Sequence, residues 1–73
     1  MTRVVWTRPA LDDVAEIRAH IARDSPRYGR IVANRLLAAV ERLRRHPLSG
    51  RIVPELAQAT LREVIEPPYR IVY

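Results

Sequence analysis

Apolar residues in the first third of the chain recur every three or four positions, which is the spacing of one face of an α-helix. They are Leu11, Val14, Ile17 and Ile21. Thr7 precedes this run and can cap a helix, because its side-chain oxygen can accept a hydrogen bond from a free backbone N–H. Pro9 fits the first turn, where no intrahelical donor is needed. The pattern predicts a helix from about Pro9 to Arg23.

A second and longer apolar run with the same period follows: Tyr28, Ile31, Val32, Leu36, Ala39, Val40 and Leu43. Ser25 is a candidate N-cap, Pro26 is a natural first helical residue, and Pro47 prevents continuation. We predict a helix from Pro26 to about Arg45, joined to the first by a very short connection as an antiparallel hairpin. Gly29 has two interpretations. It either allows a close approach to the first helix or is tolerated because it lies near a helix start.

Three short runs rich in β-branched and aromatic residues are predicted strands. They are Val4–Trp6, Leu61–Glu66 and Tyr69–Tyr73. Pro67 and Pro68 separate the last two and remove two ladder donors where the chain must turn, which favours a hairpin. Residues 48–60 are predicted to be irregular, because Pro54 argues against a central strand.

The resulting order, β-α-α-β-β, predicts one α+β domain over residues 1–73, with the antiparallel helical hairpin packed on a small antiparallel sheet. The last strand runs to Tyr73 and leaves an outer sheet edge, which another chain can pair with. A core of this size supplies only roughly 3–5 kcal/mol. Because the chain has no cysteine, disulfides cannot add to that, and we expect support from a partner, as a homo-oligomer or a hetero-oligomer.

The formal net charge of +5 comes from the second part of the chain, where nine arginines face four glutamates after residue 24. Such a basic region suits an acidic protein partner or a nucleic acid, and an ordinary solvated surface explains it equally well. Lysine is absent and alanine is common, a composition that fits a bacterial source. No apolar run approaches the roughly 18 residues of a membrane span. We expect a cytoplasmic protein without membrane contact.

Several short motifs resemble the RelE/ParE superfamily of toxins from type II toxin–antitoxin systems, and the resemblance covers essentially the whole chain. The motifs are His46-Pro47, Ser49–Arg51, Pro54–Leu56, Leu61–Val64 and Tyr69–Tyr73. The loop and the hairpin are most similar to the ParE branch. Members of the superfamily continue past the strand that Tyr69–Tyr73 matches, so the resemblance implies that the terminal strand is missing here.

The resemblance implies a function as well as a fold. ParE-like toxins inhibit DNA gyrase by protein–protein contact, trapping it on cleaved DNA, and a cognate acidic antitoxin neutralises them. RelE-like toxins are instead metal-free, ribosome-dependent mRNA endonucleases. We therefore expect a ParE-like gyrase inhibitor rather than an enzyme, without a cofactor or a metal. The alternatives are a RelE-like endonuclease and an inactive truncated remnant that still binds antitoxin.

The nuclease alternative depends on Arg70, which matches a phosphate-contacting position of RelE-like toxins, and on Arg62, which falls near another of their basic positions. Arginine is a poor proton shuttle, because it stays protonated at neutral pH. The simpler interpretation is that Arg70 pairs with Glu63 or Glu66 across the hairpin. We assign no catalytic residue.

Candidate contacts to the antitoxin or the target are basic and aromatic side chains: Arg30, Arg35, Arg42, Arg45, Trp6, Tyr69 and Tyr73. The four arginines lie on the long helix and suit an acidic antitoxin. The aromatic residues have an alternative role in packing within the fold. We do not expect direct binding of nucleic acid.

Overall fold

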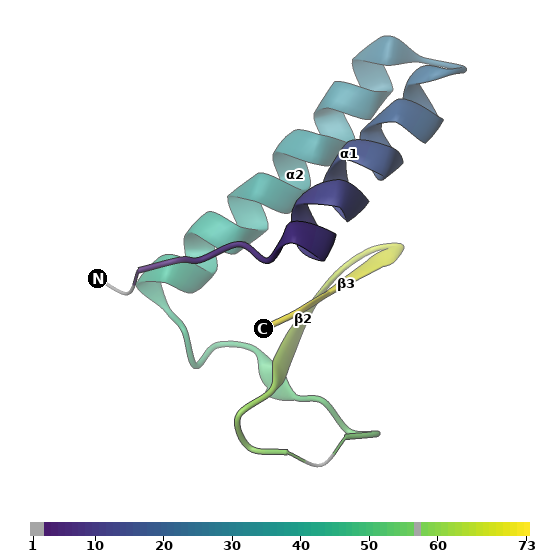
Figure 1. Cartoon of the computed structure of the whole chain (residues 1–73). Coiled ribbons are helices and arrows are strands. Elements are labelled where there is room, and N and C mark those ends of the chain that lie inside the picture. Colours follow the sequence, from purple (N-terminus) through teal and green to yellow (C-terminus); the bar gives the residue numbers. More distant parts are fainter. Residues whose placement is uncertain (1–2, 57) are drawn as a thin grey trace.

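The computed structural model describes residues 3–56 and 58–73. Two helices come first and a three-stranded antiparallel sheet follows, with the strands in sequence order across the sheet. The elements are α1 (Arg8–Ala22), α2 (Pro26–Arg45), β1 (Arg51–Ile52), β2 (Arg62–Glu66) and β3 (Tyr69–Val72). The helices form an antiparallel hairpin above the sheet (Figure 1), which confirms the predicted α+β class.

Both helices begin where the capping pattern predicts. The Thr7 hydroxyl accepts a hydrogen bond from the backbone N–H of Ala10 at 3.2 Å, and the Ser25 hydroxyl accepts one from Tyr28 at 3.1 Å. Each cap satisfies a donor that would otherwise lack an intrahelical partner. The three-residue connection between the helices therefore has defined ends, and this fixes the start of α2 beside the end of α1.

Gly29 lies at the closest approach of the two helices and is buried. A Cβ added there would lie 2.8 Å from the carbonyl oxygen of Arg18 and 3.3 Å from the Cβ of Ala22. Both neighbours belong to α1, and the first is backbone. Of the two interpretations of Gly29, the structure favours close approach.

Gly29→Ala should therefore lower the free energy of unfolding by about 1–3 kcal/mol, the usual cost of overpacking. Helix propensity alone predicts the opposite sign, because alanine is favoured over glycine by about 1 kcal/mol within a helix. Urea unfolding followed by circular dichroism measures the difference. A more stable variant would contradict the close approach.

The predicted first strand is wrong. Residues 3–7 form no strand, and Val4–Trp6 lie outside the sheet. A cavity of about 290 Å³ lies between this segment and the C-terminal end of the chain, with Val4 and Trp6 on one side and Ile71 and Tyr73 on the other. Strand propensity reflects packing against a neighbouring strand, and here no ladder forms across the gap.

The third strand of the sheet comes instead from the segment predicted to be irregular. Arg51 pairs with Glu63 and Ile52 with Arg62, so β1 is a short edge strand beside β2. Its edge position agrees with the argument that Pro54 excludes a central strand. The predicted hairpin is confirmed, with Val64 opposite Ile71 in an antiparallel register.

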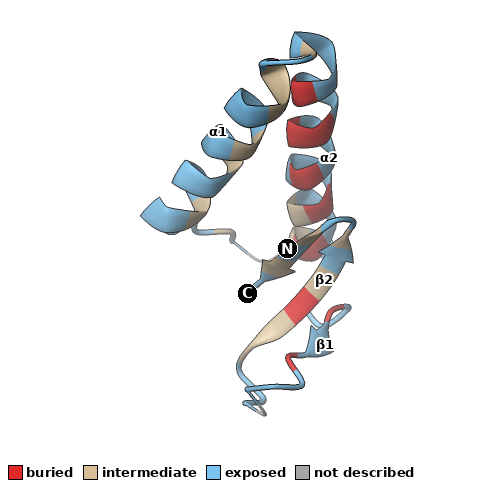
Figure 2. Cartoon of the chain, turned by 90° about the vertical axis from the view of Figure 1, so that its right-hand side faces the viewer, coloured by how far each residue is buried: buried red, intermediate tan, exposed pale blue. Residues whose placement is uncertain are grey.

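Burial is concentrated on one face of α2, as Figure 2 shows. The buried apolar residues are Val32, Ala33, Leu36, Ala39, Leu43 and Val53. Glu63 on β2 is the buried charged residue among those described, with 1 % of its surface exposed. All fifteen residues of α1 are described and none is buried. Helix α1 therefore packs on α2 and leaves its side toward the sheet partly open.

Candidate functional site

The buried Glu63 lies at the centre of a polar network on the face of the sheet that points away from the helices. Glu66 at the end of β2 pairs with Arg35 of α2, so its side chain is on the helix-facing side. Successive side chains of a strand alternate between faces. Because Val64 is opposite Ile71 and Ile65 is opposite Arg70, the side chains of Glu63 and Arg70 are on the other face.

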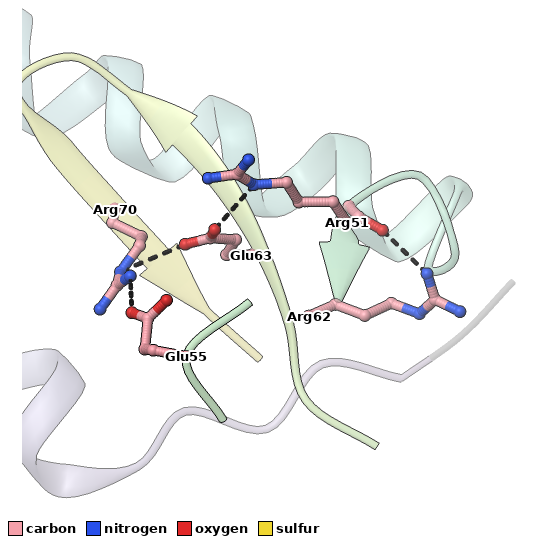
Figure 3. A network of polar contacts seen from close by, with 6 residues as sticks. Arg51, Glu55, Arg62, Glu63 and Arg70 are labelled. Atoms are coloured by element: carbon pink, nitrogen blue, oxygen red, sulfur yellow. Dashed lines mark hydrogen bonds and ion pairs between the residues drawn. The ribbon is translucent and has the colours of Figure 1, made fainter. Parts of the chain in front are cut away.

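Two arginines hold the Glu63 carboxylate from opposite sides (Figure 3). Arg51 Nε donates to Glu63 Oε1 at 2.8 Å. Arg70 Nε lies 3.2 Å from Glu63 Oε2, an ion pair whose alignment is not that of a hydrogen bond. Arg70 also donates to Glu55, which follows β1. A buried carboxylate needs such partners, and here they come from β1 and β3.

The network shifts the pKa values of two side chains, Glu55 and Arg70. A hydrogen bond from its own backbone N–H, followed by the hydrogen bond from Arg70, lowers the pKa of Glu55 below its usual 4.5. The hydrogen bond to Glu55 raises the pKa of Arg70. Arg70 therefore stays charged, and its charge is directed at two carboxylates of the chain itself.

The lowered pKa of Glu55 predicts a pH-dependent effect of Glu55→Gln. Ionised Glu55 stabilises the folded chain at pH values above the unfolded pKa, and this stabilisation is lost as the pH falls through the lower folded pKa. We expect the variant to be less stable than the parent at pH 7 and the difference to shrink below the usual value of 4.5. Urea unfolding of both chains across this range measures it. A difference independent of pH would contradict the ion pair.

Arg62 lies on the opposite face of the sheet from Arg70. Its guanidinium donates to the carbonyl oxygen of Gly50 at 2.9 Å. Tyr73 completes this cluster, because its hydroxyl donates to the Pro47 carbonyl at 2.7 Å and accepts from the Gly50 N–H at 2.9 Å. The fold therefore does not bring together the two arginines of the nuclease alternative.

The four arginines predicted as a contact surface on α2 divide into two kinds. Arg35 Nε lies 3.3 Å from one oxygen of Glu66, and an Arg42 nitrogen lies 3.5 Å from the other. These ion pairs connect α2 to the end of β2. Arg30 and Arg45 are exposed. Two partners were predicted for Arg70, Glu63 and Glu66. It pairs with Glu63, because Glu66 is directed toward α2.

The three aromatic residues predicted as contacts also have different surroundings. Tyr73 has both polar contacts within the fold, as described above. Trp6 and Tyr69 are half-buried and line an open cavity of about 370 Å³ between α1 and β3. Trp6 therefore borders both cavities, with Tyr69 in the larger one and Tyr73 in the one of about 290 Å³.

The sequence interpretation named Glu63 and Glu66 only as possible partners of Arg70, and it missed Glu55 and the pairing of Glu66 with α2. Glu55, Glu63 and Glu66 account for every carboxylate that pairs with the sheet and with the α2 arginines described above. A signal for Glu63 was present, because the alternation in β2 places it on the same face as Ile65. Its burial was not predictable, since it depends on β1 and the following loop.

Two further findings concern the described residues, 3–56 and 58–73. They contain no group of three or more histidine, aspartate or glutamate side chains placed to hold a metal ion. Neither helix combines the length and apolar character needed to cross a bilayer.

Comparison with known proteins identifies two similarities. A family model described as "ParE toxin of type II toxin-antitoxin system, parDE" matches residues 4–73. Toxin RelE2 of Caulobacter vibrioides (strain ATCC 19089 / CIP 103742 / CB 15) is 46% identical over 74 residues, which span all of this chain and 80% of that protein. No solved structure matches.

Proposed function

Because the chain belongs to the ParE toxin family of type II toxin–antitoxin systems, we propose that it inhibits DNA gyrase by protein–protein contact and that a cognate antitoxin neutralises it. Gyrase is the target that the resemblance to ParE-like toxins implies. An acidic antitoxin suits the net charge of +5. Since gyrase acts on the chromosome of a bacterial cell, the proposed site of action is the cytoplasm.

The observation that carries the proposal is the arrangement of Arg70. Metal-free RNA cleavage needs cations directed at the phosphate together with a general base and a general acid. The guanidinium of Arg70 is directed at Glu55 and Glu63 instead, and Arg62 is on the other face. The network described above is made of arginines and glutamates, with no side chain of the kind that transfers protons near neutral pH. This supports a toxin that acts by contact.

The competing proposal is a ribosome-dependent mRNA endonuclease, and the name of the relative, Toxin RelE2, favours it. Two assays with the same preparation separate the proposals. We expect the chain to inhibit DNA supercoiling by purified gyrase and to leave protein synthesis in a bacterial translation extract unchanged. Cleavage of the mRNA in that extract, with unaffected supercoiling, would overturn the gyrase proposal.

Arg70→Ala tests the same choice at one residue. If Arg70 has a structural role, gyrase inhibition by the folded variant should stay within about threefold of the parent, well below the tenfold that 1.4 kcal/mol represents. A phosphate-contacting Arg70 predicts a loss of about 10²-fold or more in mRNA cleavage. Circular dichroism supplies the folded fraction. The matched control is Arg27→Ala, at an exposed arginine of α2 that is not among the candidate contacts.

A further inference from the structure

The side chain of Arg51 on β1 is held at its Nε and open to solvent at its two terminal nitrogens. Its Nε donates to Glu63 Oε1 at 2.8 Å, and the side chain of Glu63 is fully buried, whereas that of Arg51 is 66% exposed. A guanidinium has five N–H donors in a planar fork, so four donors remain on the terminal nitrogens. Within residues 3–56 and 58–73, these nitrogens have no hydrogen bond or ion pair.

The other two arginines of the sheet use their terminal nitrogens within the fold. Arg70 directs Nε and a terminal nitrogen at two carboxylates of the chain. Arg62 lies on the helix-facing side and donates a terminal nitrogen to the carbonyl oxygen of Gly50. In Figure 3 two dashed lines reach the guanidinium of Arg70, whereas the one that reaches the guanidinium of Arg51 comes from Glu63. Arg51 is therefore the sheet arginine whose fork is directed away from the fold.

The contact with Glu63 orders Arg51 before any partner binds. Arg51 lies directly opposite Glu63 in the β1–β2 ladder, so backbone pairing and the side-chain hydrogen bond act on the same two residues. An exposed arginine normally loses rotamer freedom when a partner immobilises it, and this loss opposes binding. Because Glu63 already restrains the Arg51 guanidinium, a partner that binds the terminal nitrogens avoids part of this cost.

An exposed apolar side chain lies beside Arg51 on the outer face of the sheet. Ile65 is two residues from Glu63 on β2 and therefore on the same face, and it is 53% exposed. Since Arg51 is opposite Glu63, Ile65 is its diagonal neighbour at roughly 7–8 Å. A solvated sheet face normally carries polar side chains at such positions. Arginine beside an apolar side chain is instead typical of the centre of a protein–protein interface.

We propose that the outer-face patch, which we define as Arg51 and Ile65 above the buried Glu63, contacts gyrase, and that the two terminal nitrogens of Arg51 bind a carboxylate of gyrase. The planar fork of an arginine matches a carboxylate in a bidentate arrangement, so charge complementarity selects an acidic side chain as the partner group. Glu63 is then a positioning residue that holds Arg51 through Nε. This inference rests on the proposed function and deepens it, because it names the surface that meets the target.

Arg51→Lys tests the fork separately from the charge. Lysine keeps the positive charge and can still pair with Glu63, but its one ammonium group cannot also offer a planar fork to a second carboxylate. We expect its binding to immobilised bacterial gyrase, measured by biolayer interferometry and corrected for the folded fraction, to be about tenfold or more weaker than that of the parent. Arg27→Lys, at an exposed arginine of α2, is the matched control and should stay within about twofold.

The same measurement with and without bound DNA identifies the partner group. A phosphate of DNA would also fit the fork of Arg51, but it is present only with DNA. A carboxylate of gyrase predicts the same loss of affinity for Arg51→Lys in both conditions. A parent chain that binds gyrase only when DNA is bound, or a loss for Arg51→Lys that appears only with DNA, would overturn the carboxylate in favour of the phosphate.

The restraint on Arg51 is measured without gyrase, by the exchange of arginine Nε–H protons with water in ¹⁵N NMR. The Nε–H of Arg51 should exchange more slowly than that of the exposed Arg27, because it is bonded to a buried carboxylate. In folded Glu63→Gln this protection should decrease, and gyrase binding should weaken although Arg51 is still present. Exchange at Arg51 as fast as at Arg27, or unchanged gyrase binding of folded Glu63→Gln, would overturn the role of Glu63 in positioning Arg51.

Failure of this contact and failure of the gyrase target give different results. Equal gyrase binding by the parent and by Arg51→Lys would reject only the contact at Arg51, and so would an equal loss in Arg27→Lys. A parent chain that neither binds nor inhibits gyrase would reject the target and the contact together. The expected result is a parent chain that binds and inhibits gyrase, with a selective loss of both in Arg51→Lys.

Discussion

Glu63→Gln should lower the free energy of unfolding by about 1.5–3 kcal/mol, the usual contribution of hydrogen bonds to a charged group. Glutamine keeps the size of the side chain and removes its charge, so Arg51 and Arg70 lose their shared counter-ion. Both arginines are partly exposed, at 66% and 46% of their side-chain surface. Water therefore hydrates them in part, and this keeps the loss below the 3–5 kcal/mol expected for a fully buried pair.

The consequence is large because the chain is small. A core of this size supplies only roughly 3–5 kcal/mol, so the substitution removes a large part of the total. Urea unfolding at pH 7, followed by circular dichroism, measures the change. The matched control is Glu41→Gln, whose carboxylate is half-exposed and pairs with Arg44 one turn away on α2. It should change stability by less than about 0.5 kcal/mol. Equal effects of the two substitutions would show that the Glu63 network does not stabilise the sheet.

Gly50→Ala should destabilise the chain by about 2–4 kcal/mol, combining overpacking with the loss of hydrogen bonds. A Cβ at this position would lie 2.5 Å from the Tyr73 hydroxyl oxygen and 2.7 Å from the backbone oxygen of Glu63. Gly50 does not have a positive φ, so the effect is steric and owes nothing to backbone strain. Either the Tyr73 ring moves, and loses its bonds to Pro47 and Gly50, or β2 shifts.

Tyr73→Phe separates the two parts of this effect. Phenylalanine loses the hydroxyl bonds without adding an atom near Gly50, and should cost about 1–2 kcal/mol. The double variant should be less destabilised than the sum of the single variants, because the closest clash disappears with the hydroxyl. Strict additivity in urea unfolding, or a neutral Gly50→Ala, would contradict the packing of Tyr73 against Gly50.

Elements whose signals are local were predictable from the sequence. The apolar period and the caps at Thr7 and Ser25 located both helices, and the runs around Pro67 located the β2–β3 hairpin. Val4–Trp6 was predicted wrongly, because strand propensity describes a residue and not the presence of a strand to pair with. Arg51–Ile52 was missed for the converse reason. A two-residue strand has almost no sequence pattern of its own, and it forms because its backbone pairs with β2.

The polar contacts were less predictable, because they join segments far apart in the sequence. The charge total treated the four α2 arginines predicted as contacts alike, yet Arg35 and Arg42 pair with Glu66, and Arg30 and Arg45 are exposed. Which arginines remain available to a partner depends on the docking of α2 on the end of β2.

We propose that this toxin acts by contact on DNA gyrase, whereas its sheet arginines stabilise the fold. The most direct measurement is the fraction of plasmid DNA that purified bacterial gyrase leaves cleaved, with and without the chain. We expect cleaved DNA to accumulate as the chain is added, and we expect Arg70→Ala, corrected for its folded fraction, to have nearly the same effect. Unchanged DNA cleavage, together with mRNA cleavage in a translation extract that Arg70→Ala abolishes, would contradict it.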